Sequence, residues 1–263
     1  MKALGIIPAR KGSQRFPNKH HALLLGKPMF AYTLEAALAS RHLDRVVISS
    51  DDLELKPLAV RYGVEFLERP KELCTLTAAL EDAIRHVCRF LQKRDGFQPD
   101  VVVTLLGNVP VRRAGQIDQV IERLESLPEA TAVCTAQNLR LRPEWAKKIA
   151  QEKTGEAVPF LTGHAAYRAQ DYPPLYLMDG AAAAVRWDTL FAQEGERAAH
   201  AWFGERLHLV VQEHSMYSLE VDYPDQAALA EYYLLVQRWG DRWMEELIRQ
   251  GRQGLPAEVT SRE

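Results

Sequence analysis

The sequence is poor in cysteine and has no long hydrophobic run, and both shortages narrow the class of protein. Three of the 263 residues are cysteines, Cys74, Cys88 and Cys134, and none forms a Cys-x-x-Cys pair. This odd, widely spaced set excludes a disulfide framework and a thiolate zinc site, and it indicates free thiols in a reducing compartment. The first apolar run, residues 3–7, ends at Pro8 and is too short for a signal peptide or a membrane span. We therefore expect a cytoplasmic protein.

An excess of one charge sign is also missing. Lys and Arg number 33 against 35 for Asp and Glu, which gives a formal net charge of −2. This balance argues against a protein that binds nucleic acid or acidic membranes by electrostatic attraction. With 47% hydrophobic and 26% charged residues, the composition is that of an ordinary globular protein, and the length suits one large α/β domain or one domain with an appendage.

Short apolar runs alternate with helical patterns in the first part of the chain. The pattern predicts strands at residues 2–7, 45–49, 64–67 and 100–106, and helices between residues 28 and 40, over 53–62, and around 80–91. Asp51 and Asp52 follow a strand, and we expect them to start the next helix rather than to bind a metal. Such alternation predicts a parallel sheet covered by helices on both faces.

The alternation stops between residues 138 and 180, where four prolines interrupt any long element. This segment is predicted to be an inserted arm or subdomain within a single domain that spans residues 1–240. Residues 181–185 and 207–211 are candidates for strands that rejoin the sheet, and residues 225–250 are predicted to form a long helix. The tail, residues 251–263, is expected to be frayed.

The loop at residues 8–19 has four cations, Gly12 and Ser13 directly after a buried strand. Glycine lets backbone N–H groups approach a phosphate closely, and Arg and Lys add charge-assisted hydrogen bonds, so this loop is suited to a triphosphate. A solvated basic turn explains the charges alone equally well. The loop lacks both Gly-x-x-x-x-Gly-Lys-Ser/Thr and Gly-x-Gly-x-x-Gly, which excludes a P-loop or a dinucleotide fingerprint.

These residues carry a resemblance to a known family. The run IIPARKGSQRFPNKH, then Gly26-Lys27-Pro28 and RVVISSDD, is similar to the opening of the cytidylyltransferases that activate sugar acids, of the acylneuraminate and Kdo type. The family pattern matches Pro8, Ala9, Arg10, Ser13, Arg15, Pro17 and Lys19. Further matches in chain order are Arg69-Pro70, Leu105 to Pro110, Arg168-x-Gln170, Asp179-Gly180-Ala181 and Glu220-Val221-Asp222.

The resemblance implies transfer of CMP from CTP to the anomeric hydroxyl of a sugar acid of the nonulosonic type, with release of pyrophosphate. It implies a Rossmann-like, doubly wound, mostly parallel sheet of the nucleotide-diphospho-sugar transferase type, and an inserted arm that forms a homodimer. By position, the residues that hold CTP would be Ala9, Arg10, Gly12, Ser13, Arg15, Lys19, Arg69 and Thr77. Those that hold the sugar acid would be Asn108, Arg168, Gln170 and Asp179, and the catalytic residues would be Arg10, Lys19 and Asp222.

Glu220 and Asp222 are the candidate ligands for Mg²⁺. A reaction that releases pyrophosphate needs a hard divalent cation, and magnesium takes one or two protein carboxylates in such sites. One residue separates the two, so on a strand both side chains point the same way. Without the resemblance, a charged strand end beside the next helix is the simpler explanation. The eight histidines show no metal-ligand spacing, and His20 is as consistent with a surface position as with a nucleotide contact.

The sugar half of the match departs from the family. Residues 107–113 stand where sialic-acid-activating members carry Gln-Pro-Thr-Ser-Pro-Leu-Arg, and Asp179 replaces an Asn. Because unpaired buried polar groups are costly, such changes alter which sugar is accepted. The alternatives therefore stay open: a Kdo-like eight-carbon or unfamiliar acceptor, or a non-catalytic nucleotide-binding protein of the same fold.

Overall fold

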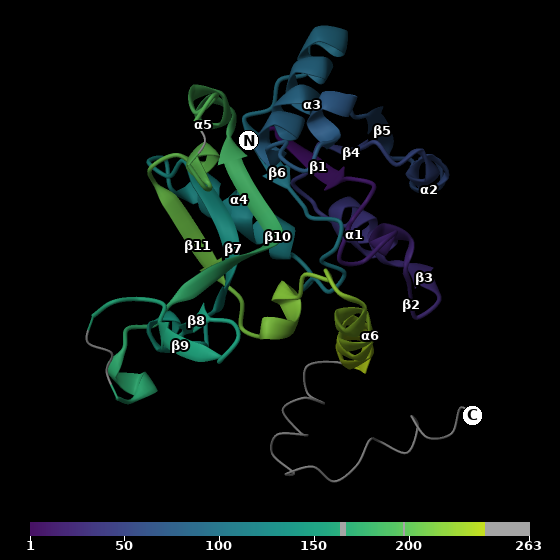
Figure 1. Cartoon of the computed structure of the whole chain (residues 1–263). Helices are drawn as coiled ribbons and strands as arrows, with labels where there is room; N and C mark the ends of the chain where they lie inside the picture. Colours follow the sequence, from purple (N-terminus) through teal and green to yellow (C-terminus); the bar gives the residue numbers. More distant parts are fainter. Residues whose placement is uncertain (164–166, 197, 240–263) are drawn as a thin grey trace.

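A seven-stranded mixed sheet forms the centre of the computed structural model, which describes residues 1–163, 167–196 and 198–239 (Figure 1). The strand order is β11-β7-β10-β6-β1-β4-β5. All neighbouring strands run parallel except β10, which is antiparallel to both β6 and β7. The strands are β1 Ala3–Ala9, β4 Arg45–Ser50, β5 Glu65–Glu68, β6 Val101–Thr104, β7 Ala132–Asn138, β10 Tyr176–Arg186 and β11 Leu207–Val211.

Helices cover both faces of this sheet. One apolar cluster joins the sheet to α1, α2 and α4, and a second joins its other face to α3 and α5. A sixth helix, α6, packs against the β2–β3 hairpin and the segment around Val221. The helices are α1 Met29–Leu38, α2 Lys56–Tyr62, α3 Leu80–Asp95, α4 Gln116–Ser126, α5 Trp187–Ala192 and α6 Pro224–Trp239, and the hairpin strands are β2 Leu23–Leu24 and β3 Lys27–Pro28.

The sequence predictions for the first half of the chain agree with this structure. The strands predicted at 2–7, 45–49, 64–67 and 100–106 correspond to β1, β4, β5 and β6, and the helices to α1, α2 and α3. The region predicted as one helix over 53–62 is a 3-10 turn, Leu53–Leu55, followed by α2, which ends at Gly63 with φ of 64°. The doubly wound, mostly parallel sheet is confirmed, with β10 as its antiparallel member.

The second half of the chain differs more. Helix α4 and most of β7 have no counterpart among the predicted elements. Residues 181–185 belong to a longer strand, β10, whose residues Tyr176–Met178 pair with the end of β7. Helix α6 confirms the first part of the helix predicted at 225–250, and the rest of that prediction and the tail lie outside the described residues.

The predicted arm extends from the end of β7 to the start of β10 and projects below the sheet in Figure 1. Its regular part is the ribbon of β8 Lys147–Gln151 and β9 Glu156–Pro159, which pair antiparallel. Within the described residues, the short 3-10 turns are Lys19–His21, Leu53–Leu55, Lys71–Cys74, Pro143–Trp145, Ala169–Asp171, Ala201–Phe203 and Ser215–Ser218.

Candidate functional site

A cavity of about 520 Å³ opens at the carboxyl edge of β1, β5 and β6. Parallel strands of an α/β sheet place ligand-binding loops at this edge. The lining comes from the loop after β1, from residues 69–80, from the loop after β6 and from the segment before α6. Its polar members are Arg10, Ser13, Gln14, Arg15, Lys19, His20, Arg69, Thr75, Asn108, Glu220 and Asp222.

Asp222 lies at the centre of the charged residues in this cavity. Lys19 Nζ donates to Asp222 Oδ1 over 2.7 Å, Asn108 Nδ2 donates to the same oxygen over 3.0 Å, and Arg15 pairs with Oδ2. Burial opposes the charged form of Asp222, but Lys19 and Arg15 outweigh it and lower the pKa of the carboxyl. The loop after β1 and the segment before α6 therefore meet here, and Asp222 is held ionised beside two cations.

Glu220 lines the same cavity, but its electrostatic surroundings are different. Burial raises the pKa of its carboxyl to about 7, and the negative charges of Asp222 and Asp179 add to that effect. The prediction that both carboxylates face one side is confirmed by their shared cavity. The prediction of a strand is wrong, because residues 219–222 belong to none of the described strands. Val221 is held instead by its N–H bond to the Asn108 carbonyl over 2.8 Å.

His20 is a buried residue of the cavity wall. Its position in the sequence fitted a surface histidine equally well. It is 6% exposed and lies edge-on to Phe30, with ring centroids 5.5 Å apart. Burial lowers the pKa of its imidazole to about 3, and the neighbouring Lys19 charge contributes. His20 is therefore a neutral hydrogen-bonding group in this wall at physiological pH.

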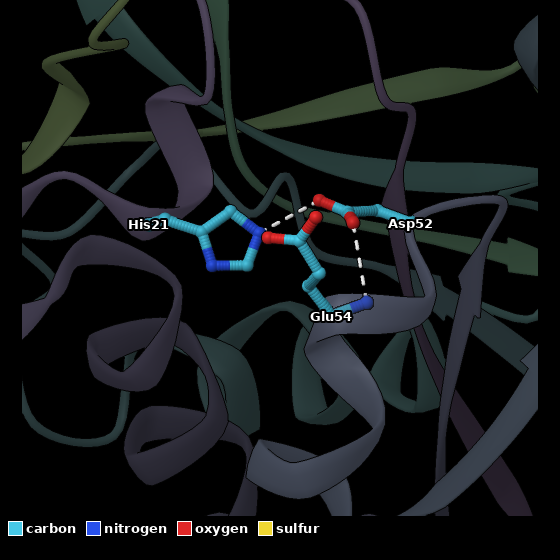
Figure 2. A group of neighbouring side chains, drawn as sticks. All are labelled: His21, Asp52 and Glu54. Carbon is cyan, nitrogen blue, oxygen red and sulfur yellow. Dashed lines mark hydrogen bonds and ion pairs between the residues drawn. The ribbon is translucent and has the colours of Figure 1, made fainter.

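The loop that carries Lys19 is anchored on its outer side by acidic residues that follow β4 (Figure 2). His21 Nε2 lies 2.7 Å from Asp52 Oδ2, and Asp52 also caps the next 3-10 turn by accepting the Glu54 N–H. The helix-start role predicted for Asp52 is confirmed. His21, Asp52 and Glu54 have their ligand atoms within 4.8 Å of one another, an arrangement their sequence spacing did not reveal. Lys11 Nζ already balances this charge, 3.0 Å from Glu54 and 3.6 Å from Asp52.

The nucleotide residues expected from the resemblance fall into two groups. Arg10, Ser13, Arg15, Lys19 and Arg69 line the cavity. Arg69 is buried and donates to the backbone and hydroxyl oxygens of Ser49, and Arg10 donates to the carbonyl of Thr75. The second group, Ala9, Gly12 and Thr77, is adjacent in sequence to lining residues without lining the cavity itself.

The expected sugar residues are spread more widely. Asn108 lines the cavity, whereas Arg168 and Gln170 lie exposed on the arm, where Arg168 pairs with Asp171. Asp179 is 1% exposed and lines neither this cavity nor the adjoining one. Its carboxylate accepts internal bonds from the hydroxyls of Thr135 and Ser218 and from the Ala181 N–H, so its donors come from the protein itself.

Asp179 and a buried arginine, Arg112, hold the segments around the cavity in place through hydrogen bonds. Arg112 Nε donates to the Ala181 carbonyl over 2.8 Å and its other nitrogens donate to Thr33 and to the carbonyls of Leu106 and Val109. Desolvation lowers the pKa of this guanidinium to about 9, which leaves it charged at neutral pH. Sequence reasoning assigned no role to Arg112, because its partners are backbone oxygens brought together only by the fold.

Gly180 follows Asp179 in the chain, and the side chains of Leu106 and Glu220 approach it closely. Its φ is 64°, and an added Cβ would lie 2.4 Å from Leu106 Cδ1 and 2.9 Å from Glu220 Oε1. Both the backbone conformation and the lack of space require glycine here.

A second cavity, of about 350 Å³, adjoins the first and shares Leu80, Leu106 and Glu220 with it. The two cavities therefore have a common wall, with one of the two carboxylates in it. One elongated ligand, or two ligands that react with each other, can occupy this pair of cavities.

Comparisons with known proteins agree with this geometry. The cytidylyltransferase family model matches residues 4–186. A 3-deoxy-manno-octulosonate cytidylyltransferase of Chlamydia abortus is 27% identical over 249 residues, which cover 89% of this chain and 94% of that protein. A CMP-N,N'-diacetyllegionaminic acid synthase of Legionella pneumophila is 33% identical over 151 residues, which cover 57% of this chain and 63% of that protein, slightly under two thirds.

Two solved structures share the fold. The structure of a CMP:2-keto-3-deoxy-manno-octonic acid synthetase complexed with CTP has a TM-score of 0.61 at 20% identity and covers 90% of this chain and 99% of its own. The 4-diphosphocytidyl-2C-methyl-D-erythritol synthase of Anaerococcus prevotii has a TM-score of 0.58 at 15% identity, with 89% and 99% covered. Within the described residues, no helix is long and apolar enough to cross a membrane. Since the family model spans most of the sheet, the chain belongs to the cytidylyltransferase family.

Proposed function

We propose that this enzyme transfers CMP from CTP to the anomeric hydroxyl of a sugar acid of the nonulosonic type and releases pyrophosphate. The observation that carries the proposal is the meeting of Arg15 and Lys19 with Asp222 in one cavity beside Asn108. Cations that neutralise phosphate charge and a carboxylate that binds a metal are the two components this transfer needs.

The loop after β1 would hold the triphosphate of CTP. Arg10, Ser13, Arg15 and Lys19 all line the cavity, and Lys19 is the least exposed of the cations paired with Asp222, at 16% for its side chain. In the ligand-free protein, the Asp222 carboxylate forms ion pairs with Arg15 and Lys19. A bound triphosphate competes for them, and Lys19 would stabilise the charge that grows on the leaving pyrophosphate. The cytosine would lie against Arg69 and against the segment that contains Thr77.

Asp222 and Glu220 would hold Mg²⁺. The donor set fits a hard cation, because both ligands are carboxylates. Burial raises the pKa of the Glu220 carboxyl, and the negative charges of Asp222 and Asp179 add to that effect, so a cation at this place would favour the ionised form. When bound, the cation would supply Lewis-acid stabilisation of phosphate oxygens. The protein's own part is to hold Asp222 in place through Lys19 and Asn108.

The adjoining cavity would take the acceptor, next to the wall that contains Glu220. A Kdo-like eight-carbon acid is the alternative acceptor, and the Chlamydia relative carries that substrate in its name. A non-catalytic protein is disfavoured, because the chain keeps the cations and both carboxylates in one cavity.

A homodimer would explain the position of Arg168 and Gln170. Both lie exposed on the arm and line neither cavity of their own chain, so in a homodimer they would be available to a substrate bound in the second copy. The arm and the adjacent strand ends expose a set of large apolar side chains, which supports contact with another subunit: Leu141, Trp145, Ile149, Phe160, Leu161, Tyr176, Leu177 and Val211. The free thiols support a reducing, cytoplasmic location.

Two measurements test the proposal. Pyrophosphate release with CTP, Mg²⁺ and a panel of sugar acids should occur with at least one acid and require both CTP and the metal. In thermal shift measurements, CTP should raise the melting temperature more than ATP or GTP, because a ligand that binds only the folded state stabilises it according to its affinity. Equal shifts for all triphosphates would contradict a cytosine site, and pyrophosphate release with none of the acids would contradict the transfer reaction.

A further inference from the structure

Three side chains with metal-ligating atoms converge where the turn that carries Lys19 meets the segment after β4 (Figure 2). His21 belongs to that turn, and Asp52 and Glu54 belong to the start of the segment after β4. Their ligand atoms lie within 4.8 Å of one another, and among the described residues this is the one group of three histidine, cysteine or acidic side chains to do so. None of the three lines the nucleotide cavity, so the proposed transfer reaction leaves this cluster unused.

Asp52 is the fixed member of the cluster. It is 3% exposed, and the hydroxyl of Ser50 accepts its backbone N–H over 2.9 Å. Its two carboxylate oxygens have different partners, since Oδ1 accepts the Glu54 N–H and Oδ2 lies 2.7 Å from His21 Nε2. Asp52 therefore caps the 3-10 turn with one oxygen and presents the other to the imidazole, held in place as a metal ligand needs to be.

A cation of the protein itself already lies against the two carboxylates. Lys11 Nζ is 3.0 Å from Glu54 Oε1 and 3.6 Å from Asp52 Oδ1. The side chains of Lys11 and Glu54 are 48% and 70% exposed, so the ammonium can withdraw into solvent and a free ion can enter. A single ammonium brings one positive charge to two carboxylates, whereas a divalent cation brings two and also accepts the imidazole nitrogen as a ligand.

The three ligand atoms need only a small rearrangement to close around a metal. In a tetrahedral site with ligands about 2.0–2.2 Å from the ion, neighbouring ligand atoms lie roughly 3.3 Å apart. The present 2.7 Å between His21 and Asp52 must therefore widen by about half an ångström. Glu54 is exposed enough for its carboxylate to rotate inward, and the backbone of His21 is held by its N–H bond to the Asn18 carbonyl over 2.9 Å.

We propose that His21 Nε2, Asp52 Oδ2 and a carboxylate oxygen of Glu54 form a second metal site, which takes Zn²⁺ or a similar divalent transition-metal ion in exchange for Lys11. One imidazole nitrogen with two carboxylate oxygens favours such an ion over Mg²⁺ and Ca²⁺, whose usual ligands are oxygens alone. Three protein ligands leave a fourth position for water. The bound ion links the turn that carries Lys19 to the segment after β4, and the site does not depend on the proposed reaction.

The test is calorimetric titration of Zn²⁺ into the full-length protein carrying Glu220→Gln and Asp222→Asn, which remove the other proposed metal site. One equivalent of Zn²⁺ should still bind. Adding Glu54→Gln, which keeps the size of an exposed side chain, should weaken the affinity at least about tenfold, because losing even an outer partner of a metal ligand costs about 10- to 100-fold. Adding His21→Ala instead should weaken it at least as much.

His42→Ala is the matched control in the same background. His42 Nε2 also lies against a carboxylate, 2.9 Å from Glu122, and its side chain is 35% exposed against 31% for His21. Among the described residues, however, it belongs to no group of three converging ligands, so its loss should leave the Zn²⁺ affinity unchanged. Zn²⁺ should raise the melting temperature of the background protein and of His42→Ala, and raise it less in Glu54→Gln. The X-ray absorption spectrum of the bound zinc should show nitrogen and oxygen ligands without sulfur.

Four results would overturn this inference. Loss of all Zn²⁺ binding in the Glu220→Gln, Asp222→Asn protein would assign the ion to those carboxylates, and an affinity that neither Glu54→Gln nor His21→Ala changes would place it elsewhere. A sulfur ligand would assign it to a thiol such as Cys74, and displacement of Zn²⁺ by an equal concentration of Mg²⁺ would make this a site for hard cations. None of these measurements depends on pyrophosphate release, so this inference and the proposed reaction fail separately.

Discussion

Replacing Lys19 with alanine should lower turnover by two to three orders of magnitude. Lys19 lines the nucleotide cavity, and its Nζ lies 2.7 Å from Asp222 Oδ1. At an effective dielectric constant near 20, a unit charge about 4 Å from a phosphate charge contributes roughly 4 kcal/mol. One group that stabilises developing charge is typically worth about 2.7–4 kcal/mol in the transition state, which corresponds to the expected loss of roughly 10²- to 10³-fold in turnover.

The matched control is Lys11→Ala. Lys11 belongs to the same loop, but its Nζ faces Glu54 and Asp52 on the outer side, and it does not line the cavity. Pyrophosphate release at saturating CTP should be near wild type in this variant, and circular dichroism should show that both variants are folded. If the two variants lose activity equally, or if Lys19→Ala keeps more than a tenth of the wild-type turnover, the assignment of Lys19 to the leaving group is refuted.

Three further predictions concern the carboxylates and the arm. Asp222→Asn should abolish magnesium-dependent turnover, whereas calorimetry with a chelator should show CTP binding that is unchanged or tighter, because the carboxylate that occupies Lys19 is gone. Glu220 ionises near pH 7 in the folded protein and near its ordinary value of 4.5 when unfolded, so the melting temperature of the metal-free enzyme should fall between pH 5 and pH 8. Glu220→Gln should remove that part of the decline, and an equal slope in both proteins would contradict the assignment. Combined Ile149→Asp and Phe160→Asp changes should give a monomer in sedimentation velocity, and an unchanged sedimentation coefficient would exclude the arm as the interface.

The sequence was most informative where local pattern and position determine the structure. The loop after β1 carries its cations within ten residues, and β1 itself ends at Ala9, so the edge of the sheet and the charge of the site were both predictable. Glu220 and Asp222 were found by their spacing together with the resemblance. The pattern could not show that the segment lies outside the strands of the sheet.

The residues that sequence reasoning missed depend on contacts between distant segments. Arg112 is bonded to the backbone of Ala181, and Trp202 lines a cavity together with residues of β7 and β10. Neither contact leaves a local pattern, because backbone carbonyls and apolar walls have no sequence signature. His21 and Asp52 were also missed as a pair, since 31 positions separate them.

The central position of β10 determines when the sheet can be completed during synthesis of the chain. Strands β6 and β7 are both made before β10, yet β10 separates them in the finished sheet, so until β10 has been synthesised β6 has only β1 beside it and β7 has neither of its neighbours. The Lys19–Asp222 pair then joins groups 203 positions apart. Contacts of such long range form late, because the chain between them must first be ordered. A nascent chain that ends at residue 186, where the family model stops, would hold the cationic loop after β1 but not Asp222, so activity should arise only after residue 222 has been synthesised.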